Sequence, residues 1–267
     1  MKAQPNETFI GKLFEQLTPK KYTMGLVLSG GAARGFAHAG VLKAMEELSI
    51  EADVVSGVSA GSIVGAFHCD GYGAEEIFEL FKKNKVFELV KPRFKKHGLL
   101  SIGGLKKVLK SNLRTTRIED LPKPLIITAT NIEEGLTTFF TEGDLVDTVL
   151  ASCSIPILFV PTKINGVSYV DGGLTNNFPV RPLEGKCKKM IGVHVNPVGA
   201  FDPEDGLRKL AIHTFHLGIA SGIQHDKEEL DYFIEPAKLR DFTYYDIKKG
   251  KEMFDIGYEE AKKVLDA

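Results

Sequence analysis

The stretch Gly57-Val58-Ser59-Ala60-Gly61 follows a short apolar run, residues 52–55, and precedes a helix-like segment, residues 63–69. A serine between two glycines at a strand-to-helix turn is typical of a nucleophile elbow. Such a turn is tight, so the residues beside the serine must be small, and the hydroxyl lies at the positive end of the following helix. The alternative is a turn serine that only caps that helix. This stretch predicts an α/β unit with Ser59 as a candidate nucleophile.

A glycine-rich loop lies upstream of this turn. Residues 24–28 read as a buried strand, Ser29-Gly30-Gly31-Ala32-Ala33-Arg34-Gly35 forms the loop, and residues 36–45 open a helix. Strand–loop–helix units expose backbone N–H groups and bind anions. A dinucleotide fingerprint does not fit because the glycines are adjacent. A phosphate-binding loop does not fit because Phe36 and Ala37 stand in place of its lysine and hydroxyl residue.

An oxyanion hole is the remaining interpretation of this loop. It needs two or three amides aimed at a developing negative charge, and Gly30, Gly31 and Ala32 can supply them. We expect Arg34 to order the loop or to add positive charge; the alternative is a solvated arginine. The sequence therefore predicts a nucleophile and an oxyanion hole about 25 residues apart.

The nucleophile also needs a proton acceptor. None of the seven histidines is expected in a glycine-bounded loop at the end of a strand. Asp171 is in such a loop, because residues 167–170 alternate like a strand and Gly172-Gly173 follows. The two glycines allow a sharp turn and leave the carboxylate uncovered, although an ordinary Asp-Gly turn has the same composition. Asp171 is the candidate base.

With these motifs in order, the chain resembles the patatin-like phospholipases. The resemblance rests on the loop ending Arg34-Gly35, the elbow at 57–61, the Ala-Ser-x-Ser-x-Pro segment at 151–156, and Asp171-Gly172-Gly173 with Asn-x-Pro at 177–179. Together the core motifs span residues 28–179.

The resemblance implies a Ser–Asp dyad without histidine, with Ser59 as nucleophile and Asp171 as proton acceptor. It also implies oxyanion donors at Gly30 and Gly31, with Arg34 as the basic residue of the loop. Ala32 is a departure, because many members have a third glycine there. Its N–H remains present, and its methyl group is expected to restrict the backbone or narrow the hole.

The implied reaction is hydrolysis of a lipid ester through an acyl-enzyme, with no cofactor and no metal. The apolar residues around Asp171 predict that burial raises its pKa, so activity should rise from mildly acidic to alkaline pH. Three alternatives remain: a histidine-triad α/β-hydrolase, an acyltransferase or thioesterase using the same site, and a non-catalytic lipid-binding scaffold.

Alternating strand and helix patterns predict a single α/β domain over residues 22–267, with three α/β/α layers and a mainly parallel sheet. Residues 1–21 form a separate N-terminal segment, in which 9–17 suit a short amphipathic helix. We expect strands at 24–28, 53–56, 124–130, 136–140, 166–170, 190–195 and 231–234. We expect helices near 37–48, 61–72, 75–84, 102–113, 145–152, 204–225 and 251–265.

Composition and cysteine spacing predict in which compartment the protein acts. The chain has 267 residues, 43% of them hydrophobic, and no run of 18 apolar residues, so we expect no membrane span. The first 21 residues lack the apolar core of a secretory signal. The three cysteines are widely spaced and without metal-binding spacing, as is typical of reduced thiols in a cytoplasmic protein.

The charge of the chain is uneven. Residues 82–117 contain twelve Lys and Arg and one acid, Glu88, whereas the net charge of the whole chain is −1. Basic and apolar residues together suit an anionic lipid surface, so this segment is predicted to be a lid or a peripheral membrane-docking surface. A solvated basic helix face is the alternative. Nothing in the pattern supports a nucleic-acid partner.

Overall fold

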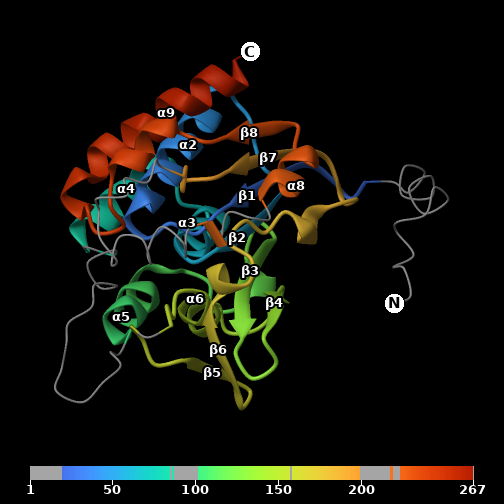
Figure 1. Ribbon diagram of the computed structural model, residues 1–267, viewed down its shortest axis with the longest axis vertical. Helices are drawn as coiled ribbons and strands as arrows, with labels where there is room; N and C mark the ends of the chain where they lie inside the picture. Colours follow the sequence, from blue (N-terminus) through green and yellow to red (C-terminus); the bar gives the residue numbers. More distant parts are fainter. Residues whose placement is uncertain are drawn as a thin grey trace.

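A mixed eight-stranded β-sheet forms the centre of the computed structural model (Figure 1). The structure describes residues 20–84, 86, 102–156, 158–198, 217–218 and 223–266, and the counts below refer to these. The strand order is β5-β6-β3-β2-β1-β7-β8, with β4 also paired to β3. The strands β3, β2, β1, β7 and β8 run parallel to one another. By contrast, β4 and β6 pair antiparallel with β3, and β5 pairs antiparallel with β6. The predicted mainly parallel α/β sheet is confirmed.

All seven predicted strands are present. They are β1 (Tyr22–Leu28), β2 (Val54–Val58), β3 (Leu125–Asn131), β4 (Leu136–Phe140), β6 (Val167–Asp171), β7 (Cys187–Val193) and β8 (Tyr232–Ile234). The sequence prediction missed β5 (Thr162–Ile164), which forms a hairpin with β6. Asn165 and Gly166 connect the two strands with φ of 49° and 86°. An Asn-Gly pair of this kind is a standard hairpin turn.

Six predicted helices are confirmed within the described residues. They are α2 (Phe36–Glu47), α3 (Ala60–Cys69), α4 (Ala74–Lys83), α5 (Gly103–Asn112), α6 (Leu145–Ser152) and α9 (Gly250–Leu265). α3 ends earlier than predicted because Gly71 adopts φ of 87° and its N–H bonds to His68 O. The predicted helix at 204–225 lies largely outside the described residues, which contain only α8 (Ile223–Glu228) at its end. The predicted helix at 9–17 also lies outside them.

Alternate residues of the strands enter two different cores, one on each face of the sheet. Leu26 and Leu28 pack with the helices α2, α3, α4, α5, α6 and α9, whereas Val27 packs against residues 178–183 and α8. Figure 1 shows α2, α4 and α9 gathered on one side of the sheet. The second covering layer is thinner within the described part of the chain.

The helices α2 and α9 pack closely against each other. A Cβ at Gly40 of α2 would collide with Phe254 O, and a Cβ at Gly257 of α9 would collide with Ala37 O. The two backbones therefore touch, which fixes α2 and the loop before it. Among the described helices, none is long and apolar enough to cross a bilayer.

Candidate active site

Ser59 lies at a sharp turn between β2 and α3. Its backbone has φ of 51° and ψ of −120°, a region that costs energy for any residue with a Cβ. A Cβ at Gly57 would lie 2.7 Å from Gly61 O, and a Cβ at Gly61 would collide with Leu28 O. The predicted need for small residues on both sides of Ser59 has this steric cause.

The hydroxyl of Ser59 faces the carboxylate of Asp171. Ser59 Oγ donates to Asp171 Oδ2 at 2.7 Å, and Gly173 N donates to Asp171 Oδ1 at 2.8 Å. The two side chains are buried, with 9% and 7% exposure. A Cβ at Gly172 would collide with Thr128 O, so this part of the turn requires glycine. The structure thus joins two groups that are 112 positions apart in the sequence.

Burial raises the pKa of Asp171 from its ordinary value of 3.8 to about 6, against the hydrogen bonds from Ser59 and Gly173, which lower it. This agrees with the direction predicted from the sequence. A carboxylate with a pKa near 6 is ionised at neutral pH and is a stronger base than a solvated aspartate.

The Ala-Ser-x-Ser-x-Pro segment holds both members of the pair. Ser59 N donates to Ser152 Oγ at 2.8 Å, and Ser152 Oγ donates onward to Thr128 O at 2.7 Å. Asp171 N donates to Ser154 O at 2.9 Å. The sequence analysis assigned these serines no role. The sequence did contain a signal for this role: two serines lie between an apolar helix pattern and a proline.

The glycine loop lies beside Ser59. A Cβ at Gly30 would be 3.3 Å from Ser59 Cβ. The amide of Gly30 donates to Asn177 O at 3.2 Å, so it is engaged, in contrast to the donor role predicted for it. Gly31 N and Ala32 N have no acceptor within hydrogen-bond distance among the described residues. The two amides available to an anion are therefore those of Gly31 and Ala32.

Ala32 has φ of 46°, in the left-handed region that favours glycine. The predicted effect of its methyl group is thus backbone strain, and its N–H is retained at the start of a short 3-10 helix, Ala32–Gly35.

Arg34 is 6% exposed, so the solvated alternative is wrong. Its Nε and Nη2 donate to Phe242 O at 3.1 and 2.7 Å, and its guanidinium lies over the Tyr244 ring, 4.6 Å from the centroid. Arg34 therefore ties the loop to the segment after β8.

Histidine does not contribute to the Ser59 hydroxyl within the described part of the chain. His38 and His68 are in helices as predicted, and burial lowers the pKa of each to about 4. His194, which was expected inside the strand at 190–195, directly follows β7; it is 1% exposed, and its Nδ1 is 2.8 Å from Glu235 Oε1. None of these rings is within hydrogen-bond distance of Ser59 Oγ.

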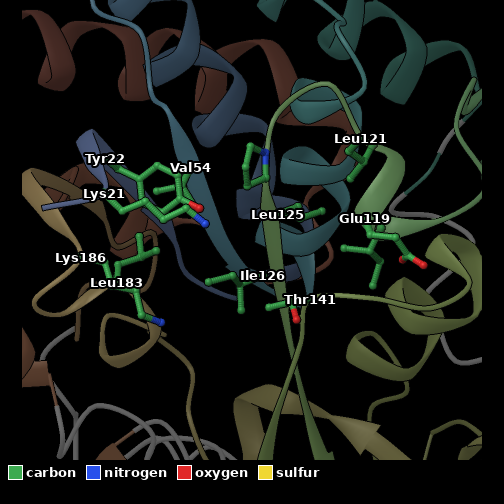
Figure 2. Close-up of a pocket in the computed structure, with 12 residues that line it drawn as sticks. Lys21, Tyr22, Val54, Glu119, Leu121, Leu125, Ile126, Thr141, Leu183 and Lys186 are labelled. Atoms are coloured by element: carbon green, nitrogen blue, oxygen red, sulfur yellow. The ribbon is translucent and has the colours of Figure 1, made fainter.

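A cavity of about 430 Å³ lies at the amino ends of β1, β2 and β3, at the end of these strands opposite to Ser59 (Figure 2). Its lining includes Tyr22, Val54, Leu125 and Ile126, with Lys21 and Lys186 at one side. Ser59 follows the carboxyl end of β2, so this cavity does not belong to the Ser59–Asp171 site.

The basic segment at 82–117 lies partly outside the described residues, which omit 85 and 87–101. In the described part, Lys106 pairs with Asp147 at 2.7 Å and Arg117 pairs with Glu119 at 2.5 Å. Arg114 lies 4.1 Å from the Tyr72 ring centroid. The side chains of Lys106, Arg114 and Arg117 therefore each contact another side chain of the same chain.

The mixed sheet, the sharp turn at Ser59 after β2 and the buried Ser59–Asp171 pair define an α/β protein with a candidate serine site at the carboxyl end of its parallel strands. The model of the family described as patatin-like phospholipase matches residues 26–184, more than half of the chain. The chain therefore belongs to the patatin-like phospholipase family.

Curated relatives match the same region. The chain is 31% identical over 182 residues to lysophospholipase NTE1 of Candida glabrata, covering 66% of this chain and 10% of that protein. It is 31% identical over 189 residues to lysophospholipase NTE1 of Eremothecium gossypii, covering 68% and 12%. It is 28% identical over 232 residues to the uncharacterized protein R571 of Acanthamoeba polyphaga mimivirus, covering 78% of each. Against the first relatives, the chain spans from a tenth to less than half of their length.

Among solved structures, VipD from Legionella pneumophila superposes with a TM-score of 0.53 and 14% identity, over 92% of this chain and 67% of that one. This likeness shows the fold alone.

Proposed function

We propose that this protein is a lipid acyl hydrolase that cleaves carboxylic esters through an acyl-enzyme on Ser59. The observation on which this depends is the 2.7 Å hydrogen bond from Ser59 Oγ to Asp171, at a strained elbow beside two amides without acceptors among the described residues. Family membership supports a lipid as the substrate class.

The reaction starts when Asp171 accepts the proton of Ser59 and the serine oxygen attacks the ester carbonyl. The carbonyl oxygen becomes an oxyanion, and the N–H groups of Gly31 and Ala32 stabilise it. The C–O bond to the leaving alcohol then breaks, and Asp171 returns its proton to that alcohol. A water molecule, deprotonated by Asp171, attacks the acyl-enzyme, and the fatty acid leaves with Ser59 restored.

A lysophospholipid is the substrate we propose first, because the relatives from Candida glabrata and Eremothecium gossypii are named lysophospholipases. An acyltransferase or thioesterase would use the same acyl-enzyme with another acceptor or donor. We further propose that residues 82–117 contact anionic membranes, on the strength of their twelve basic residues.

The test compares wild type, Ser59→Ala and Asp171→Asn on p-nitrophenyl esters and lysophosphatidylcholine. Both variants should lose at least about a thousandfold in kcat. Asp120→Asn, at an exposed position outside residues 82–117, is the matched control and should retain wild-type turnover. A fluorophosphonate probe should label wild type and the control but not Ser59→Ala.

Absence of both turnover and labelling in wild type would favour a non-catalytic scaffold. Acyl transfer to added glycerol in preference to water would favour an acyltransferase. Labelling at Ser59 with unchanged turnover in Asp171→Asn would contradict the dyad.

A further inference from the structure

The peptide group between Gly30 and Gly31 is held by residues far along the chain. Asn196 Nδ2 donates to Gly30 O at 2.6 Å, and Ser29 Oγ donates to the same oxygen at 3.0 Å. Ser29 Oγ in turn accepts from Val195 N at 3.0 Å. The Gly30 carbonyl therefore accepts from two side chains. Residues that follow β7 provide one of them, Asn196, and hold the other, Ser29, through Val195 N.

Holding this carbonyl also orients an amide. In a planar trans peptide the C=O of one residue and the N–H of the next point in opposite directions. A hydrogen bond from Asn196 to Gly30 O therefore aims the Gly31 N–H, one of the two amides without an acceptor among the described residues. The next peptide is held in the same way: Arg34 N donates to Gly31 O at 3.0 Å, which orients the Ala32 N–H.

The same asparagine is tied to the C-terminal part of the chain. Asn196 Oδ1 accepts from Arg34 Nη1 at 3.5 Å, and the remaining guanidinium nitrogens of Arg34 donate to Phe242 O. Ala33 N donates to Tyr244 O at 3.3 Å. The loop is thus fastened on one side by Asn196 and on the other by residues 242–244.

The contact is also sterically close. A Cβ at Gly31 would collide with Val195 Cγ2 and would lie 3.3 Å from Asn196 Oδ1. These partners lie beyond residue 184, where the match to the family model ends.

We infer that Asn196 is a positioning residue of the oxyanion hole: its Nδ2 holds the Gly30 carbonyl so that the Gly31 N–H faces the developing oxyanion. This inference rests on the proposed function. It assigns a role in the site to the part of the chain after β7, through one side-chain amide and the backbone carbonyls of Phe242 and Tyr244.

Asn196→Asp tests this with almost no change of shape. At pH 8 the carboxylate still accepts from Arg34 but donates nothing to Gly30 O. We expect kcat on p-nitrophenyl butyrate to fall about 10- to 100-fold with KM changed by less than about twofold. Affinity for a trifluoromethyl ketone, which forms an oxyanion on the serine, should fall by a similar factor. Asn165→Asp makes the same chemical change at an exposed hairpin turn and should leave all three values unchanged.

Arg34→Lys provides a second variant, because it keeps the charge but cannot donate two bonds to Phe242 O; the same loss in kcat at constant KM is expected. Hydrogen exchange of a peptide covering residues 29–36 should be faster in both variants by about tenfold. If Asn196→Asp retains wild-type kcat and inhibitor affinity, or if exchange in this peptide is unchanged, the inference is wrong. Exchange does not depend on turnover, so a wild type without esterase activity would refute the proposed function while the exchange result still decides the role of Asn196.

Discussion

Replacing Asp171 by asparagine removes a buried charge and leaves the shape and most hydrogen-bonding capacity in place. The pKa of Asp171 is about 6 in the folded protein and 3.8 as its ordinary value. The group therefore binds more protons in the folded state between these values, and the wild type loses stability as the pH rises from 3.8 to 6. At 1.36 kcal/mol for each pH unit, the loss is about 3 kcal/mol at neutral pH.

We expect Asp171→Asn to be more stable than wild type by up to about 3 kcal/mol at pH 7.5 and to differ little below pH 4. Urea unfolding at the two pH values measures this difference. Asp120→Asn, at an exposed position, is the control and should show no such dependence. In the same pH range, wild-type kcat/KM on a soluble ester should rise with an apparent pKa of about 6 and level off above pH 7, because only the carboxylate accepts the serine proton.

Two results would refute this reasoning. The first is an equal stability difference between Asp171→Asn and wild type at both pH values, which would mean that burial does not destabilise the charge. The second is a rate that stays flat from pH 5 to 9 while chemistry is rate-limiting, which would mean that Asp171 is not the base.

Three other substitutions test separate parts of the site. Ala32→Gly should keep kcat within about threefold and the free energy of unfolding within about 1 kcal/mol, since relief of the positive φ offsets the added chain entropy; a loss of unfolding free energy well above 1 kcal/mol would contradict the assigned strain. Ser152→Ala should lower the free energy of unfolding in urea by about 2–4 kcal/mol, because Ser59 N and Thr128 O both lose their partner, and a change as small as that of Ser111→Ala, at an exposed position of α5, would refute this. Charge reversal in the basic segment should weaken sedimentation with anionic liposomes but leave neutral liposomes unaffected, and unchanged binding would exclude that surface. The residues to reverse are Lys91, Arg93, Lys95 and Lys96.

The sequence predicted those parts of the fold and site that depend on local steric rules. Glycine on both sides of Ser59 and after Asp171 marks turns in which a Cβ would collide with backbone, and such turns are visible as short motifs. The strands β1, β2, β3 and β7 were found because buried parallel strands are short apolar runs. By contrast, β5 has only three residues, and its hairpin turn was the stronger signal.

The residues that hold the glycine loop were not predictable in this way. Phe242 and Tyr244 contribute backbone carbonyls, which every residue possesses, so no side-chain pattern reports them. Asn196 contributes a side chain, but its partner Gly30 O lies 166 positions away. Likewise, the sequence gives no sign that the Gly30 N–H, expected to be an oxyanion donor, instead donates to Asn177 O.

The site combines three features that cost stability, and the proposed chemistry gives a reason for each. Ser59 and Ala32 both have positive φ, and Asp171 is a carboxylate removed from water. A protein selected only for stability would relieve such strain, because each case costs on the order of 1–3 kcal/mol. In the proposed mechanism each one instead places a reacting group: the hydroxyl clear of the elbow, an amide toward the oxyanion, and a base strong enough to accept the serine proton. The three costs therefore support a common catalytic role more strongly than any one of them alone.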